Sequence, residues 1–196
     1  MSNKALLIVD VQNDFCSGGS LPVTEGDEVI TPLNTMIDYA RKNGWLIIYT
    51  RDSHPLQTKH FKQWPVHCVA NTQGSEFHQK LTQPDNFDLI ISKGIKPDED
   101  GYSAFDGVAG RYPIPLIRWL KFFEINELFV GGLAIDYCVK ATAIDAIVFG
   151  FKTTVLLDAC RAVNLRAEDE NKAIREMENI GTIISTTTEV LEELGQ

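Results

Sequence analysis

Short strand-like runs alternate with longer segments of helical periodicity along almost the whole sequence. Runs such as 5–9 and 46–51 are too continuously apolar for strands with one solvated face, and they are typical of strands buried on both faces. Parallel strands need helical crossovers of one hand between them. The alternation therefore predicts an α/β fold, a three-layer αβα sandwich with a doubly wound, mostly parallel sheet of about six strands.

The expected elements follow from these patterns. Strands are expected at 5–9, 46–51, 87–92, 128–132, 152–157 and 182–185. Helices are expected at 29–40, 113–123, 137–149 and 168–179, with a short one after Thr186. Pro32 is tolerable in the first turn of its helix, and Gly44 is a suitable stop. The segment 52–86 is long, irregular and rich in His, Gln, Pro and Gly, and a loop of that length in a compact domain is usually functional.

Composition narrows the class of protein. The length favours one domain, 1–196, carrying a metal-binding loop region at about 52–86. A formal net charge of -9, from 18 Lys+Arg and 27 Asp+Glu, argues against nucleic acid and anionic membranes as partners. No run approaches the length of a signal or membrane segment, so we expect a cytoplasmic protein with a small-molecule substrate. The four cysteines lack paired spacing and are expected to be free thiols.

Four chemically capable side chains lie just beyond strand-like runs: Asp10, Asp52, Lys93 and Cys138. In an open parallel sheet the carboxyl ends of the strands lie along one edge, and reactive groups gather where the strand order reverses. The sequence therefore predicts that these four residues share one pocket.

Cys138 is the candidate nucleophile. It follows a strand and a Gly-Gly turn, with Asp136 as a candidate N-cap, so it is expected in the first turn of a helix. There the helix dipole and the unpaired amides favour a thiolate and can receive an oxyanion. The alternative is a small buried hydrophobe, which describes most free cysteines.

Asp10 and Lys93 strengthen the catalytic interpretation. A charged residue directly after a buried strand must be paired, and a structural Asp10–Lys93 salt bridge is one explanation. In the catalytic explanation, Asp10 takes the thiol proton and later returns it to the leaving group, while Lys93 orients Asp10. Such a set needs no catalytic histidine.

All four histidines fall within one loop region. Asp52 and His54 at a strand end, followed by His60 and His67, supply a ligand set suited to Zn²⁺, Fe²⁺ or Mn²⁺ with solvent positions left open. A solvated loop with exposed histidines is the alternative. His78 is expected to be structural.

Four segments carry a resemblance to a known family. The sequence DVQNDFC at 10–16, with GGSL at 18–21, resembles the opening motif of the nicotinamidases (pyrazinamidases), within the isochorismatase-like cysteine hydrolase superfamily. DSHP at 52–55 resembles the metal motif of that family, WPVHCV at 64–69 its next signature, and GLAIDYCV at 132–139 its nucleophile turn. The resemblance runs in order over nearly the whole chain.

The resemblance implies a function and a set of catalytic residues. It implies hydrolysis of nicotinamide to nicotinate and ammonia, and of pyrazinamide, in NAD salvage through a cysteine thioester. Asp10, Lys93 and Cys138 would be the catalytic triad. The amides of Ala134 and Cys138 would form the oxyanion hole, after a cis peptide bond between Leu133 and Ala134.

The resemblance also implies a bound metal. Asp52, His54 and His67 would hold one divalent transition metal, with zinc preferred over iron or manganese, and the metal would coordinate the ring nitrogen of the substrate. His60 stands where some members have a further ligand and others do not, so its role is left open.

Aromatic residues are candidates to line the flat substrate ring: Phe15, Trp64, Tyr102 and Tyr137. On sequence alone each is equally compatible with the core. Two positions depart from the family pattern. Ile135 replaces the usual Thr in the nucleophile turn, which removes a hydroxyl and keeps the amides. Asn71 replaces a usual Gly, and Asn tolerates left-handed geometry.

Two rival functions remain at this stage. One is another cysteine amidase of the superfamily, acting on a carbamoyl or ureido substrate, although such relatives generally lack the metal motif. The other is a non-catalytic metal- or ligand-binding protein, which the intact triad disfavours. The sequence does not fix the oligomeric state, and a homo-oligomer is compatible with it.

Overall fold

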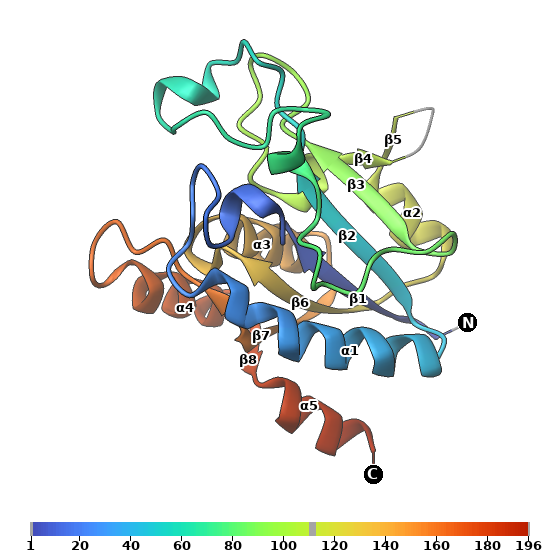
Figure 1. The fold of residues 1–196 in the computed structure, drawn as a ribbon. Coiled ribbons are helices and arrows are strands. Elements are labelled where there is room, and N and C mark those ends of the chain that lie inside the picture. The colour runs from blue at the N-terminus through green and yellow to red at the C-terminus, as the bar shows by residue number, and fades with distance from the viewer. Residues whose placement is uncertain (1, 110–112, 196) are drawn as a thin grey trace.

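An eight-stranded sheet in the strand order β5-β4-β3-β2-β1-β6-β7-β8 forms the centre of the computed structural model (Figure 1). The structure describes residues 2–109 and 113–195, so both ends of the expected domain 1–196 lie outside the described residues. The strands are β1 (Lys4–Val9), β2 (Leu46–Asp52), β3 (Leu89–Lys93), β4 (Val108–Ala109), β5 (Ile114–Pro115), β6 (Glu127–Leu133), β7 (Lys152–Arg161) and β8 (Ile183–Ser185).

The six longer strands, β1 to β3 and β6 to β8, form one continuous part of the sheet. Within it, each strand runs parallel to the strands beside it. β1 lies between β2 and β6, and Ala5 is the register partner of both Leu46 and Leu128. β4 and β5 pair antiparallel at the β3 edge. The sheet has eight strands where about six were expected, and the additional two are β4 and β5. Each has only two residues, which is too short to leave an apolar run in the sequence.

Helices cover both faces of the sheet, as the predicted three-layer fold requires (Figure 1). One face packs against α1 (Ile30–Lys42) and α5 (Thr187–Leu194), through residues such as Leu33 and Val190. The other face packs against α2 (Leu116–Phe122), α3 (Lys140–Val148) and α4 (Asp169–Asn179). None of the helices in the described ranges combines the length and the apolar character needed to cross a membrane.

Within the described residues, six short helical turns connect these elements. They are η1 (Asn13–Phe15), η2 (Gly26–Val29), η3 (His60–Lys62), η4 (Gln73–Ser75), η5 (Ala104–Asp106) and η6 (Ile135–Val139). The predicted helix at 137–149 thus begins earlier, as the π-helical turn η6, and continues as α3. Pro32 lies in the first turn of α1, and Gly44 follows that helix with φ +65°.

The segment between β2 and β3 is the long irregular loop that the sequence predicts. Within it, the described structure has no helix or strand longer than the turns η3 and η4. Figure 1 shows it, in teal and green, beyond the end of β2. Asn71 adopts φ +64°, the left-handed geometry expected for this position.

The strand order changes direction at β1, because β2 and β3 lie on one side of it and β6 to β8 on the other. The carboxyl ends of β1, β2, β3 and β6 therefore meet at the edge where open α/β sheets place their ligands. Asp10, Asp52, Lys93 and the turn that carries Cys138 all lie at this edge.

Candidate active site and metal site

Lys93 is the centre of the polar group at the carboxyl edge of the sheet. Asp52 and Lys93 are register partners at the ends of β2 and β3, and Asp10 follows β1 with φ +50°. Lys93 Nζ lies 2.7 Å from Asp10 Oδ2 and 2.5 Å from Asp52 Oδ1, and it donates to Gly101 O at 2.6 Å. Cys138 Sγ is 3.5 Å from the same nitrogen. The predicted four residues therefore meet, and Lys93 bridges both carboxylates rather than Asp10 alone.

Burial controls the ionisation of this group. Asp10 and Lys93 are fully buried, and Asp52 and Cys138 nearly so. Burial alone would lower the pKa of Lys93, but the two carboxylates outweigh it and hold that pKa well above its ordinary value. Burial raises the pKa of Asp10 despite the opposing effect of Lys93. For Asp52 burial also acts upward, but Lys93 and His54 together outweigh it and lower the pKa.

The surroundings of Cys138 favour its thiol over its thiolate. Burial raises the pKa of Cys138 well above its ordinary value, and Lys93 offsets only part of this effect. A carboxylate oxygen of Asp10 lies within 4.8 Å of Cys138 Sγ. The resting residue is thus a neutral thiol with a carboxylate placed to accept its proton.

Thr50 orients the carboxylate and was missed by the sequence analysis. Its hydroxyl donates to Asp10 Oδ1 at 2.6 Å, while Lys93 contacts Oδ2. Both oxygens of Asp10 are therefore tied to the neighbouring strands. A threonine inside a β-branched strand run carries no sequence signal that separates this role from ordinary strand propensity.

The nucleophile turn exposes main-chain amides beside the sulfur. Residue 134 has extended geometry and precedes η6, and the peptide bond between Leu133 and Ala134 is cis, as the resemblance implied. Among the described residues, no oxygen accepts a hydrogen bond from the amide of Ala134, and no oxygen outside η6 accepts one from the amide of Cys138. Unpaired amides at the start of a helix are suited to receive a developing negative charge.

Asp136 does not have the capping role expected from the sequence. Ala134 is the N-cap residue, and the buried Asp136 carboxylate instead accepts from the amides of Val163 and Asn164, each at 2.9 Å. This carboxylate fastens the loop after β7 to the nucleophile turn. The prediction was wrong because the helix begins earlier, at Ile135, so the carboxylate lies inside the first turn.

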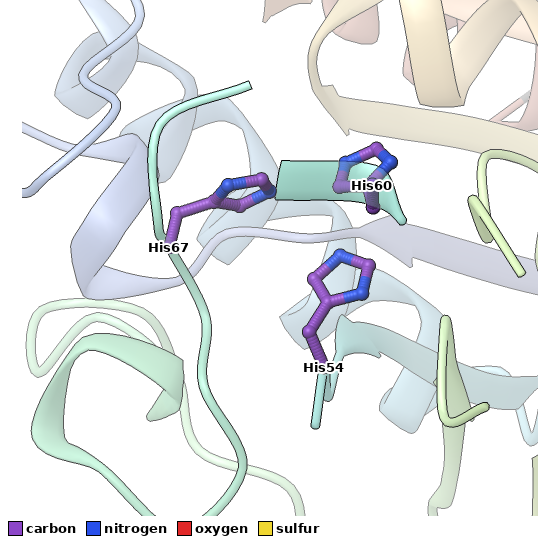
Figure 2. A group of neighbouring side chains, drawn as sticks. All are labelled: His54, His60 and His67. Carbon is purple, nitrogen blue, oxygen red and sulfur yellow. The ribbon is translucent and has the colours of Figure 1, made fainter. Parts of the chain in front are cut away.

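The rings of His54, His60 and His67 converge on one point (Figure 2). His54 and His60 stack with ring centroids 4.6 Å apart, and one nitrogen of each of His54, His60 and His67 lies within 4.8 Å of the others. All three residues are buried. His60, whose role the sequence left open, thus belongs to the same group, whereas His78 does not.

The Nδ1 atom of each of these rings already faces an oxygen acceptor. The acceptors are Gly94 O for His54 at 3.1 Å, Asp100 Oδ1 for His60 at 2.9 Å and Pro65 O for His67 at 2.7 Å. Carbonyl and carboxylate oxygens only accept, so these contacts place a hydrogen on each Nδ1, and in the tautomer with that hydrogen alone the lone pair is on Nε2. The three Nε2 atoms are thereby left as potential metal ligands.

This donor set fits a divalent transition metal. Asp52 Oδ2 lies 3.7 Å from His54 Nε2 and 3.9 Å from His67 Nε2, distances that leave room for an ion between them. His54 Nε2 is buried without a hydrogen-bond partner in the described part of the chain, which a metal bond would satisfy. Imidazole with carboxylate suits zinc, iron and manganese alike.

Gly94 makes space for one of these ligands. It has φ +63°, and a Cβ there would lie 2.4 Å from Cε1 of His54. Since no real side chain can approach so closely, the position of the His54 ring depends on a residue without one.

One pocket opens onto both the cysteine and the group of histidines. Its lining includes Cys138 as well as Asp52, His60 and His67. The four aromatic candidates from the sequence also line it: Phe15, Trp64, Tyr102 and Tyr137. Trp64 Nε1 donates to Tyr102 Oη at 2.9 Å. Aliphatic residues that the sequence analysis did not single out complete the wall, among them Leu21, Leu133 and Val163.

Comparison with known proteins agrees with this geometry. The family model of the isochorismatase domain matches residues 4–189. The chain belongs to the isochorismatase family. Within this family it is 38% identical over 214 residues to the nicotinamidase of Escherichia coli (strain K12), and the match covers 100% of both proteins.

Solved structures of the isochorismatase family have the same fold. The pyrazinamidase of Pyrococcus horikoshii in complex with zinc is similar with a TM-score of 0.85 and 39% identity, over 94% of this chain and 99% of its own. The yeast nicotinamidase bound to the inhibitor nicotinaldehyde has a TM-score of 0.81 and 31% identity, over 93% and 99%. The predicted fold class is confirmed.

Proposed function

We propose that the protein is a metal-dependent cysteine amidohydrolase that converts nicotinamide to nicotinate and ammonia, and that also hydrolyses pyrazinamide. The observation that carries this proposal is the opening of one pocket onto both Cys138 and the group of Nε2 atoms. A pyridine ring nitrogen and its carboxamide can then be held at opposite ends of the same small site. The similarity to nicotinamidases over the full chain supports it.

The triad supplies the chemistry. Asp10 takes the proton of the Cys138 thiol as sulfur attacks the carboxamide carbon, and the amides of Ala134 and Cys138 hold the oxyanion. The same proton passes from Asp10 to the leaving nitrogen, which departs as ammonia and leaves a thioester. A water molecule, deprotonated by Asp10, then hydrolyses the thioester to the carboxylate and restores the thiol.

Lys93 compensates the negative charge that moves between Asp10 and Cys138 during the reaction. Its ammonium remains charged throughout, since the two carboxylates hold its pKa well above the ordinary range. It therefore opposes the charge of Asp10 in the resting site and of the Cys138 sulfur after proton transfer. The raised pKa of Asp10 suits a group that must both accept and return a proton.

Asp52, His54, His60 and His67 would hold the metal, which we assign as zinc, with iron and manganese as alternatives. A metal held by these residues would act as a Lewis acid toward the ring nitrogen and would so help to orient the substrate. Phe15, Trp64, Tyr102 and Tyr137 would enclose the flat ring. The cellular role would be NAD salvage in the cytoplasm, with a small molecule as the partner.

Ammonia release from three amides tests the proposal. Metal-loaded protein should hydrolyse nicotinamide and pyrazinamide, whereas benzamide, which lacks the ring nitrogen, should be a poor substrate. A chelator should lower the first two activities, and added zinc should restore them. Equal hydrolysis of benzamide and nicotinamide would contradict ring coordination, and activity confined to carbamoyl or ureido substrates would favour the rival amidase. A protein that bound nicotinamide without releasing ammonia would be a non-catalytic binder.

A further inference from the structure

A second group of metal-ligand side chains lies outside the proposed active site. Cys16, Asp27 and His78 each contribute one ligand-type atom, and these three atoms lie within 4.8 Å of one another. Cys16 is buried, with 1% of its surface exposed, and the other two residues are partly buried. The proposed reaction uses none of them.

Three separate segments bring this group together. Cys16 directly follows η1, Asp27 lies in η2, and His78 lies in the loop between β2 and β3. The main chain of His78 is fixed, because its amide donates to Val11 O at 2.9 Å. The three side chains are therefore brought together by the folding of separate segments. They are not neighbours on a single flexible loop.

The group contains one anionic side chain and one thiol that a metal could deprotonate. The Ser17 amide donates to Asp27 Oδ1 at 2.9 Å and lowers the pKa of Asp27, so this residue stays ionised. Burial, followed by the charge of Asp27, raises the pKa of the Cys16 thiol to about 12. With zinc bound, the Cys16 thiol would be deprotonated, and its thiolate and the Asp27 carboxylate would balance the two charges of the ion.

The geometry is close to that of a zinc site. In a tetrahedral site with bonds of about 2.0–2.3 Å, ligand atoms are separated by about 3.5 Å, so side-chain movements of about 1 Å would close this group around an ion. The three histidines of the active site meet the same 4.8 Å limit. The side-chain hydrogen bond of His78, in which Nδ1 accepts from the Lys80 amide, is long at 3.3 Å.

We propose that Cys16, Asp27 and His78 form a second zinc site, with solvent as the fourth ligand, which braces one wall of the substrate pocket. Binding of each ion releases the Cys16 thiol proton to solvent, forms a zinc–sulfur bond and leaves the oxidation states unchanged. The soft sulfur ligand favours zinc over magnesium, calcium or manganese.

The position of the group suggests what the ion would stabilise. Phe15, the residue before Cys16, lines the pocket, and its ring centroid lies 5.3 Å from that of His67. Val23, in the segment leading to Asp27, donates its amide to Phe15 O at 3.0 Å. An ion that joins Cys16 to Asp27 would therefore limit the movement of Phe15.

Cobalt substitution tests the proposal independently of activity. Cys138→Ala protein, which lacks the thiol beside the triad, is loaded with Co²⁺ and freed of unbound metal. We expect two ions per chain and a near-ultraviolet sulfur-to-cobalt charge-transfer absorption. Cys16→Ser and His78→Gln should each reduce the content to one ion, and Cys16→Ser should abolish the absorption. The matched control Cys160→Ser, at another buried thiol, should retain both.

One bound ion per chain, or an absorption unchanged by Cys16→Ser, would overturn the proposal. Asp27→Asn guards against a failure of the Cys16 variant to fold, because it removes the charge of a partly exposed ligand and keeps its shape. It should also reduce the content to one ion, and retention of two would count against the site. A second readout is Zn²⁺-dependent thermal stability in protein in which His54, His60 and His67 are all changed to Ala, which should persist there and disappear when Cys16→Ser is added.

Discussion

The two halves of the pocket are built in different ways. The triad half sits on the ends of neighbouring strands, where Asp10, Lys93 and Asp52 are fixed by sheet register and by one another. The histidine half is held by an irregular loop, whose position depends on single contacts such as the bond from the Cys68 amide to Asp14 Oδ2 at 2.7 Å. The difference suggests that the reaction is set by the rigid sheet edge and the choice of substrate by the loop.

The largest effect should come from the nucleophile alone. Cys138→Ala should lower kcat for nicotinamide by more than about 10⁴-fold, because no other group can form the thioester. Its folding and bound metal should be unchanged, since the histidine half does not depend on the sulfur. Steady-state kinetics and elemental analysis check both points, with Cys160→Ala as the buried-thiol control. Substantial turnover by Cys138→Ala would refute the mechanism.

The charged pair offers a way to separate the two halves. Asp10→Asn should lower the single-turnover rate by about 10²–10⁴-fold and leave the metal in place, because it removes the base alone. Lys93→Met should lower the rate and also weaken metal binding, because Asp52 loses its partner. It should in addition cost about 3–5 kcal/mol of unfolding free energy, measured in urea, by leaving buried carboxylates unpaired. Equal metal affinity in both variants would show that Lys93 does not link the halves.

Removal of a ring in the loop tests the histidine half directly. His60→Ala should weaken zinc binding by at least about tenfold, while excess zinc should restore much of the activity. Competition with a chromogenic chelator measures the affinity. Unchanged zinc affinity would mean that His60 lies near the ion without ligating it. The triad should remain competent in this variant, in contrast to Lys93→Met.

The smallest effect is expected from the outer partner of the same ring. Asp100→Asn keeps the shape of the side chain and weakens the contact with His60 Nδ1. Because the Asp100 side chain is 49% exposed, we expect a loss of zinc affinity of about tenfold, the lower end of such effects. The change should appear in zinc affinity and not in the single-turnover rate at saturating zinc.

Much of the site could be predicted because strand ends are visible in sequence. Asp10, Asp52 and Lys93 follow or end apolar runs, and the rule for parallel sheets brings them together. The contact of Lys93 with both Asp10 and Asp52 could not be predicted. The apolar sequence of a strand shows where the strand ends, but it does not show which residues of the neighbouring strands the last side chain contacts. The hydrogen bonds of Thr50 and Asp136 could not be predicted for a related reason. Their partners lie at least 27 positions away in the chain.

Short-range signals failed where the local structure was unusual. The π-helical turn shifted the helix start to Ile135, and strands β4 and β5 are too short for any periodicity to be detected. The resemblance to a family supplied what periodicity could not, including the cis bond before Ala134. The aliphatic wall residue Val163 was missed because an apolar residue in a pocket has the same pattern as one in the core.

The close packing of Gly94 against His54 also bears on how such a protein can diverge. A single base change that gives position 94 a side chain would displace His54, a proposed metal ligand, without touching a residue of the proposed triad. Descendants of this chain could therefore lose the metal in one step and keep an intact nucleophile, ready for selection on other amides. Residue 94 is thus a position to inspect first when family members with a cysteine triad differ in their metal requirement.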